Sequence, residues 1–430
     1  MDHILKLDDL LHESSSDDEL EIISAFAIAK ERLENERGSI SRRGSSRRRK
    51  AIFRNSLQGE ENILRDYFAA SPVYPPRKFR RRFRMRRELF LRIHDAIVDH
   101  EPYFVQRRNA AGKLGHSSLQ KMIAAIKMLA YGVTANFMDE YLRIGEATVM
   151  DSFKLFVKAV ISIFSVQYLR SPNEDDVARL LAIGESRGFS GMLGSIDCMH
   201  WKWKNCPSAW KGMYSGHVHE PTIILEAVAS YDHWIWHAFF GLPGSHNDIN
   251  VLNRSSVFTN LAAGRAPPVN YSVNGHNYTM GYYLADGIYP SWATFVKTIH
   301  APQGNKRKNF AAAQESARKD VERAFGVLQA RFSIIRGPAR LHQPEMLNEI
   351  MIACIILHNM IVEDERDLYQ EADAFDYEQI NDTPLEPLSR EHTAEALDFI
   401  QNRHRIKDRE IHSQLQSDLV EHLWQIHSQS

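Results

Sequence analysis

The segments MLGSID at residues 192–197 and YYLADGIYP at 282–290 decide the fold class of this chain. In each segment a short apolar run leads to an aspartate, Asp197 in the first and Asp286 in the second. Short apolar runs bounded by glycine, proline or asparagine are typical of buried strands. An aspartate that ends such a strand is costly to bury unless it is paired or bound to a cation. The two segments therefore predict sheet strands that carry acidic groups at their ends.

The neighbouring segments predict the rest of this sheet and the helices that cover it. TIILEAVAS (222–230) and WIWHAFFG (234–241) predict a hairpin. The segment 311–335 has an apolar stripe at helical spacing, and 345–364 is a second, strongly apolar helix. Three adjacent strands, a fourth strand and then helices predict an α/β domain over residues 186–365.

Residues 61–185 predict an all-helical domain that precedes the sheet. Ser117 or Ser118 can cap a helix that ends at Gly132, and a further helix begins near Glu146 after a glycine turn. Two helices joined by such a turn match the outline of a helix-turn-helix. A bundle whose helices only pack against one another has the same outline, so both interpretations stay open.

The net charge of -1 conceals acidic and basic segments that lie apart in the chain. Residues 1–60 are acidic at first and then rich in serine and arginine, and we expect most of them to be disordered. Their basic run at 42–50 suits a nuclear import signal, a phosphate-binding arm or a solvated linker. Residues 366–430 predict an acidic linker and a C-terminal helix, which is either a dimer contact or a helix packed against its own chain.

A second basic run, RKFRRRFRMRR at 77–87, has eight cations in eleven residues, with large apolar side chains between them. This alternation predicts a helix with one buried face and one basic face. A basic face needs a polyanion or ample solvent, so DNA phosphate is the favoured partner and a solvated face is the alternative. The candidate DNA-binding residues here are Arg80, Arg81, Arg82 and Arg84.

The composition excludes several classes of protein. A hydrophobic content of 43% is ordinary for a folded soluble protein. Three cysteines are too few and too scattered for a disulfide framework, which favours the cytoplasm or the nucleus. The sequence has no run of about 18 apolar residues and no basic-then-apolar N-terminus, so we expect neither a membrane span nor secretion.

Asp197, Asp286 and Glu322 follow one another in the order strand, strand, helix, with 88 and then 35 residues between them. Neighbouring carboxylates raise one another's pKa, and a divalent cation relieves their repulsion. Two Mg²⁺ ions roughly 4 Å apart can hold the attacking and leaving oxygens of a phosphodiester displacement. Ribonuclease-H-like nucleases present their Asp-Asp-Glu set in this order. Each acid alone suits an ordinary turn or surface position, whereas the three together favour a metal-dependent nuclease.

Other residues near these acids have more than one interpretation. Arg318 lies four residues before Glu322 on the same helix face, where it suits a contact with phosphate or with the acids. His246 is the histidine best placed to approach a substrate, and His217 and His219 lack the further ligands of a zinc site. The tryptophans between residues 201 and 292 are expected mainly to pack in the core, with stacking on unpaired bases as the alternative.

Four blocks resemble the signature motifs of PIF/Harbinger transposases, in particular the Pong and Ping branch of plant elements. The blocks are GSIDCMHW (194–201), LPGSHNDINVLNRSSVF (242–258), YYLADGIYP (282–290) and ESARKDVERAFGVLQARF (315–332). The resemblance implies a ribonuclease-H-like domain that binds divalent metal, with acidic positions at Asp197, Asp248, Asp286 and Glu322. In that set Asp248 is either a further metal ligand or an organiser of the site.

The resemblance also implies an activity and its partners. It implies a DNA transposase that uses Mg²⁺ or Mn²⁺, with two ions, to cut phosphodiester bonds and transfer strands at terminal inverted repeats. Double-stranded DNA at the element ends and at the target is the implied substrate, and a Myb-like accessory protein the implied partner. We expect a homo-oligomer in the nucleus, or in the cytoplasm until the partner imports it. The alternative is a domesticated nuclear protein that acts on chromatin or transcription without cleavage.

Overall fold

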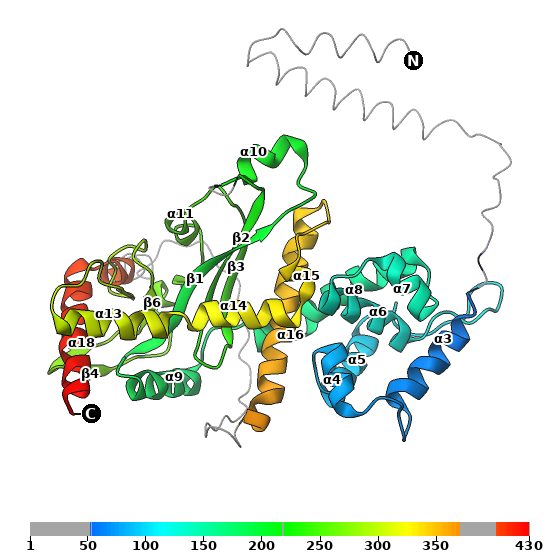
Figure 1. The fold of residues 1–430 in the computed structure, drawn as a ribbon, viewed down its shortest axis with the longest axis horizontal. Helices are drawn as coiled ribbons and strands as arrows, with labels where there is room; N and C mark the ends of the chain where they lie inside the picture. Colours follow the sequence, from blue (N-terminus) through cyan, green and yellow to red (C-terminus); the bar gives the residue numbers. More distant parts are fainter. Residues whose placement is uncertain (1–51, 53, 217–218, 370–400, 430) are drawn as a thin grey trace, which may run out of the picture. The chain divides into compact units, whose positions relative to one another are not determined.

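The computed structural model describes residues 52, 54–216, 219–369 and 401–429 (Figure 1). The expectations of disorder, of a nuclear import run and of an acidic linker fall mostly on residues 1–51 and 370–400, outside the described residues. Within the segment 1–60, helix α3 begins at Ser56.

The α/β part is built on a mixed five-stranded sheet in the order β3-β2-β1-β6-β7. The first three strands pair antiparallel, whereas β6 runs parallel to β1 and β7 runs parallel to β6. The predicted α/β class and the predicted hairpin are confirmed. The strands are β1 (Met192–Lys202), β2 (Thr222–Ala229), β3 (Ile235–Pro243), β6 (Tyr282–Ala285) and β7 (Phe295–Lys297).

Strand β1 is longer than the sequence indicated. Its antiparallel pairing with β2 runs from Ser195 to Lys202, so the prediction that Asp197 ends a strand is wrong. On the other side of β1, the parallel pairing with β6 stops at Ser195, opposite Leu284. Asp197 therefore lies just past the end of β6, at the level of the sheet where Asp286 directly follows that strand.

Helices that precede the first strand in the sequence and helices that follow the last one cover this sheet. Helices α9 (Glu174–Ser186), α13 (Asn305–Arg318) and α14 (Asp320–Arg331) contact β1, and α13 and α14 run almost end to end (Figure 1). The single helix predicted over 311–335 is therefore wrong, because the helix breaks at Lys319. The break starts a new helix, and Glu322 lies in its first turn.

The C-terminal helix α18 (Arg409–Gln429) packs against its own chain. It contacts α13, β7 and the small sheet of β4 (Tyr271–Val273) and β5 (His276–Tyr278). Its buried leucines share an apolar cluster with residues of β1, β5 and β6, and they are Leu415, Leu419 and Leu423. Of the two interpretations of this helix, the structure favours the packed one.

Residues 54–168 are predominantly helical, as the sequence predicted. Ser117 caps α6 in a capping box with Gln120, and α6 ends at Gly132, whose φ of 65° suits glycine. Helix α8 begins at Glu146, as expected. The helices are α3 (Ser56–Ile63), η1 (Leu64–Phe68), α4 (Pro76–Phe83), α5 (Arg87–His100), α6 (Ser118–Tyr131), α7 (Ala135–Leu142) and α8 (Glu146–Tyr168).

Helix α16 (Pro344–Tyr369) connects the helical part to the sheet, because it packs against both α8 and β3. Its Asn359 is fully buried and donates to the carbonyl oxygens of Tyr168 (2.7 Å) and Ile235 (2.8 Å). The amide oxygen of Asn359 accepts from the N–H of Ile235 at 2.9 Å. By length and composition the segment Pro344–Arg366 could cross a membrane, but 78% of its most apolar window is buried, as in a core helix.

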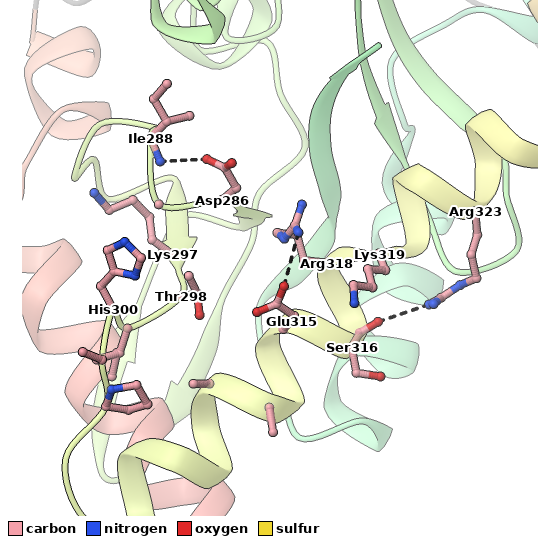
Figure 2. Close-up of a pocket in the computed structure, with 16 residues that line it drawn as sticks. Asp286, Ile288, Lys297, Thr298, His300, Glu315, Ser316, Arg318, Lys319 and Arg323 are labelled. Atoms are coloured by element: carbon pink, nitrogen blue, oxygen red, sulfur yellow. Dashed lines mark hydrogen bonds and ion pairs between the residues drawn. The ribbon is translucent and has the colours of Figure 1, made fainter.

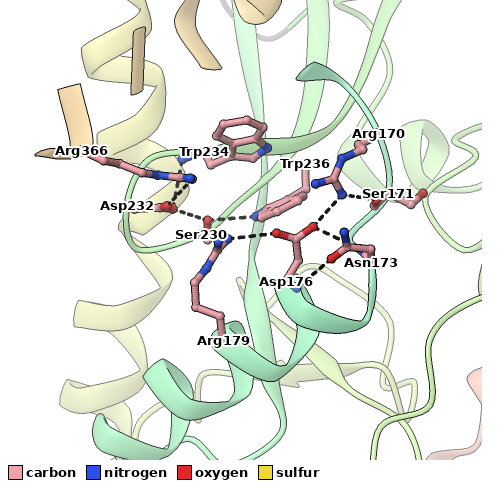
Figure 3. A network of polar contacts seen from close by, with 10 residues as sticks. All are labelled: Arg170, Ser171, Asn173, Asp176, Arg179, Ser230, Asp232, Trp234, Trp236 and Arg366. Atoms are coloured by element: carbon pink, nitrogen blue, oxygen red, sulfur yellow. Dashed lines mark hydrogen bonds and ion pairs between the residues drawn. The ribbon is translucent and has the colours of Figure 1, made fainter. Parts of the chain in front are cut away.

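A polar network fixes the β2–β3 turn between α9 and α16 (Figure 3). Asp176, in the first turn of α9, pairs with Arg170 at 2.6 Å and with Arg179 at 3.4 Å. Asp232 in the turn pairs with Arg366 of α16 at 3.2 Å. Burial opposes ionisation of Asp232, but Arg366 and a hydrogen bond outweigh it and hold the pKa of Asp232 below its ordinary value.

The tryptophans mostly pack in the core, as expected. Trp201 and Trp203 on β1 and its extension donate their indole N–H groups to the carbonyl oxygens of Gly337 and Leu341, both at 2.8 Å. Trp234 and Trp236 are also buried, whereas Trp210 is 40% exposed. Trp210 lies among the short elements of the connections, which are η2 (Ser208–Trp210), α10 (Lys211–Tyr214), α11 (Asp248–Leu252), α12 (Thr259–Ala262) and α15 (Ser333–Arg336).

If α18 is part of the folded unit, Leu419→Ala will destabilise the chain by about 2–5 kcal/mol, because this leucine is fully buried. Ile426→Ala on the same helix is the control, since its side chain is 41% exposed and the expected change is within about 0.5 kcal/mol. Urea unfolding of the two variants measures both effects. Equal stabilities would show that α18 is not docked in solution.

Candidate functional site

Arg318 links two of the three core acids. Its Nη1 lies 3.3 Å from Asp197 Oδ2 and 2.9 Å from Glu322 Oε1. The Arg318 side chain is only 12% exposed, and its other nitrogen lies 3.6 Å from Glu315. Although α13 ends at Arg318, residues 318 and 322 keep helical i,i+4 contact across the break at Lys319. Of the two roles considered for Arg318, the structure shows the contact with the acids.

Asp197 is the acid whose ionisation is most perturbed. Burial raises its pKa to about 6, and the negative charges of Asp248 and Glu322 act in the same direction. The N–H of Cys198, which donates to Asp197 Oδ1 at 2.8 Å, and the Arg318 guanidinium oppose that rise. A carboxyl group with a pKa this close to neutrality is typical of a functional site.

Asp248 is the first residue of α11, where Asn247 caps the helix by accepting from the N–H of Asn250. Burial raises the pKa of Asp248, and the charges of Asp286 and Glu226 raise it further. A hydrogen bond with the Cys198 thiol acts in the opposite direction. The four acids predicted from the sequence are therefore linked by pairwise charge interactions. Asp197 interacts with Asp248 and Glu322, and Asp248 interacts with Asp286.

Asp286 lies at the edge of a cavity of about 1120 Å³ between β7 and the end of α13 (Figure 2). Its Oδ1 accepts from the N–H of Ile288 at 2.7 Å, which fixes the carboxylate just beyond β6. Lys297 on β7 lines the same cavity and donates to the carbonyl oxygen of Tyr289 at 2.9 Å. Burial lowers the pKa of Lys297, and Asp286 opposes that change.

Sequence reasoning missed a fifth acid, Glu226 on β2. It is fully buried and stands opposite Cys198 of β1. Neither of its carboxyl oxygens has a hydrogen-bond partner within the described residues. The nearest basic group is His237, whose Nε2 lies 3.5 Å from Glu226 Oε1 and 3.0 Å from Ser255 Oγ. The one signal in the sequence was a glutamate in the otherwise apolar run TIILEAVAS, which alternation alone does not single out.

The donor types in this site suit a hard divalent cation, since carboxylate oxygens are the preferred ligands of Mg²⁺. The burial that raises the pKa of Asp197, and the lack of a hydrogen-bond partner for either carboxyl oxygen of Glu226, also suit a site that a cation completes. Among the described residues, no three His, Cys, Asp or Glu side chains lie close enough together to hold a metal ion. Mg²⁺ often uses only one or two carboxylates and keeps water and phosphate as its other ligands, so the residues fit such an ion without a preformed cage.

Much of the predicted basic face has partners within the chain. Phe79 and Phe83 bury one face of α4, as predicted. On the other face, Arg80 pairs with Glu365 of α16 at 2.7 Å, and Arg82 stacks on the ring of Tyr74 at 3.7 Å. Arg81 is exposed, as are Arg77 and Lys78.

Arg84 follows α4 with a φ of 66°, and its guanidinium lies over the ring of Tyr131. Of the four arginines of this run that were predicted to bind DNA, Arg81 is thus the one that is exposed. Among the histidines, His246 Nε2 accepts a hydrogen bond from Arg254 Nη1 at 2.9 Å, and His217 lies outside the described residues.

Asp197→Asn is expected to stabilise the metal-free chain at pH 7 by up to about 3 kcal/mol and to have no effect near pH 4. Because the pKa of Asp197 is raised from 3.8 to about 6 by folding, the folded state holds its proton more tightly. The wild type therefore loses stability as the pH rises through this range, whereas asparagine stays neutral. Thermal unfolding in EDTA between pH 4 and pH 8 measures the difference. A difference that does not change with pH would contradict the assignment.

Two buried glutamates should respond in opposite ways to conversion into glutamine. Glu365→Gln removes the charge that Arg80 and Arg331 contact, so a loss of about 3–5 kcal/mol is expected. Glu226→Gln removes a buried charge without a hydrogen-bonded partner, so we expect a higher melting temperature in EDTA. A fall in the Glu226→Gln melting temperature like that of Glu365→Gln would mean that Glu226 has a structural partner.

Comparison with known proteins gives matches to transposon-related proteins that agree with one another. A model described as plant transposon protein matches residues 166–369, and a domain of unknown function matches residues 59–98. HARBI1 of Homo sapiens, which is named provisionally as a nuclease, is 22% identical over 255 residues, covering 58% of this chain and 68% of that protein. HARBI1 of Bos taurus matches with the same identity and coverage.

A plant relative also matches. The ALP1-like protein of Arabidopsis thaliana is 22% identical over 255 residues, covering 57% of this chain and 61% of its own. No solved structure matches the chain significantly. The transposon match covers the elements from α9 to α16, which carry Asp197, Asp248, Asp286 and Glu322. By these matches and by its four sequence blocks, the chain is similar to Harbinger-type transposases and to the proteins related to them.

Proposed function

We propose that this chain is a divalent-metal-dependent DNA endonuclease that acts as the transposase of a Harbinger-type element. The observation that carries the proposal is the position of Asp197 on β1 just past the end of β6, at the level of the sheet where Asp286 follows that strand, with Glu322 on the adjoining helix α14. This arrangement joins a central strand, a parallel neighbouring strand and a helix. It supports a ribonuclease-H-like organisation of the catalytic domain.

The proposed substrate is double-stranded DNA at the terminal inverted repeats of the element, cut by displacement at phosphorus. A bound Mg²⁺ or Mn²⁺ ion would supply positive charge for the transferred phosphoryl group. Asp197, Asp248, Asp286 and Glu322 would supply the carboxylate ligands of one or two such ions, with one or two carboxylates to each ion. The protein itself would hold these carboxylates in fixed positions beside the reacting phosphate and so orient the attacking water or hydroxyl.

Arg318 has a second role in this proposal. Its guanidinium is nearly buried and lies at the acids, so it is in place to balance charge as a phosphate enters and leaves. Glu322 is 43% exposed, so it is open to a substrate from the solvent side. Strand β1 and helix α14 would hold the reacting groups in orientation, which would lower the entropic cost of reaching the transition state.

A second function is favoured by one feature of the same site. Arg318 pairs with Asp197 and Glu322, and no three candidate ligands are gathered among the described residues. An arginine in that place suits a domesticated protein that binds nuclear DNA without cleaving it. The two functions differ in whether a metal ion produces strand breaks.

The nuclease proposal predicts that the wild type nicks supercoiled plasmid carrying the element's inverted repeats when Mg²⁺ or Mn²⁺ is added. Asp197→Ala and Glu322→Ala should each lower the rate by about 100-fold or more, because several kcal/mol of transition-state stabilisation are lost. The matched control is Glu410→Ala, another exposed glutamate in the first turn of a helix, far along the chain in α18.

The outcomes separate the two functions. Equal cleavage by the wild type and both acid variants would show that the nuclease activity does not come from this site. DNA binding without cleavage under either metal would favour the domesticated protein. A rate loss in Glu410→Ala equal to that in Glu322→Ala would point to a general effect of lost negative charge.

A further inference from the structure

The cavity beside Asp286 has two basic walls that face each other (Figure 2). One wall is β7 and the loop after it, with Lys297, Thr298 and His300. The other is the junction of α13 and α14, with Arg318, Lys319 and Arg323. At about 1120 Å³ the cavity exceeds the usual range of small-molecule pockets, about 300–1,000 Å³. Its size suits a segment of a polymer better than a single small ligand.

The cations of these walls differ in whether they already form ion pairs with carboxylates of the protein. Arg318 is taken up by the acids, and Arg323 pairs with Asp320. Lys297 donates to a carbonyl oxygen, which leaves its positive charge without a carboxylate partner. Lys319 and His300 are exposed, and neither side chain has a hydrogen bond or ion pair within the described residues. The cavity therefore presents the cations of Lys297 and Lys319, neither of which has an ion pair with a carboxylate among the described residues, beside the carboxylates of Asp286 and Glu315.

We infer that this cavity binds the sugar-phosphate backbone of the DNA strand next to the phosphate that lies at Asp286. The inference rests on the proposed function for the identity of the polymer, and it assigns the strand's path. Phosphates spaced along a backbone match cations on two facing walls, and Lys319 and Lys297 are the contacts. Such contacts position a duplex without reading its sequence.

The position of Lys319 makes the assignment specific. It is the residue between α13 and α14, and its neighbour Arg318 holds Asp197 and Glu322. A phosphate bound by Lys319 is thereby placed next to the acidic set. Helix α13 offers a matched control, because its Lys308 is also an exposed lysine but does not line the cavity.

The test measures binding of a fluorescent DNA duplex to the full chain in EDTA, as a function of salt concentration. Each phosphate contact contributes about −0.9 to the slope of log K against log salt. Lys319→Ala and Lys297→Ala should each make the slope less negative by about 0.9, and the double variant by about twice as much. Lys308→Ala should leave the slope unchanged. Circular dichroism and melting temperatures check that each variant is folded.

Several results would overturn the inference: a slope in folded Lys319→Ala equal to the wild type, an equal change in Lys308→Ala, or no binding of DNA by the wild type. Equal binding of an RNA duplex, with the same loss in Lys319→Ala, would reject DNA as the polymer. Because no metal is present, the result is independent of cleavage. A less negative salt slope in Lys319→Ala, together with no metal-dependent nicking by the wild type, would support DNA binding in the cavity and reject the nuclease. Nicking by the wild type with an unchanged slope in Lys319→Ala would reject only DNA binding in the cavity.

Discussion

The contact of Arg318 with Asp197 and Glu322 is the interaction on which the candidate site depends. Carboxylates gathered at one end of a sheet repel one another, and burial adds to the cost of their ionisation. The pKa of Asp197 is raised to about 6 because burial outweighs the opposing effect of Arg318. A carboxyl group whose pKa is perturbed in this way is typical of functional sites. The same contact also ties the junction of α13 and α14 to β1, so the acids and the basic cavity share one support.

The register of the sheet explains why the acids meet. Strand β1 pairs with β2 along most of its length but with β6 only as far as Ser195. Past Ser195, strand β1 no longer pairs with β6, and Asp197 and Asp286 lie at this level of the sheet. Glu226 lies in β2, opposite Cys198, so the fully buried acid is a cross-strand neighbour of the residue after Asp197. The break at Lys319 then turns a cation towards the cavity while Glu322 keeps its contact with Arg318.

The helical part shows how a basic pattern can have two meanings. The alternation of arginine and large apolar residues in 77–87 correctly predicted the half-buried helix α4, because burial follows from spacing. It did not predict that this helix ends at Phe83 and that α5 starts anew at Arg87. It did not show that Arg80 and Arg86 pair with Glu365 and Asp364 of α16, almost three hundred positions later in the chain. These pairs attach the helical part to the same helix that Asn359 attaches to the sheet. The basic run therefore serves the fold at some positions, and exposed residues such as Arg81 remain candidates for DNA.

The sequence by itself determined the α/β class, the hairpin, the capped helices before it and the similarity to Harbinger-type transposases, and it singled out four acids as candidates for the site. These features depend on periodicity, capping residues and long motifs, all of which are local in the chain. Only the tertiary structure decided that Asp197 lies inside a long strand, that α14 starts anew at Asp320, and that Arg318 contacts both Asp197 and Glu322. It alone revealed Glu226 and the basic cavity, because burial and charge balance depend on which side chains meet across strands and helices that are far apart in sequence.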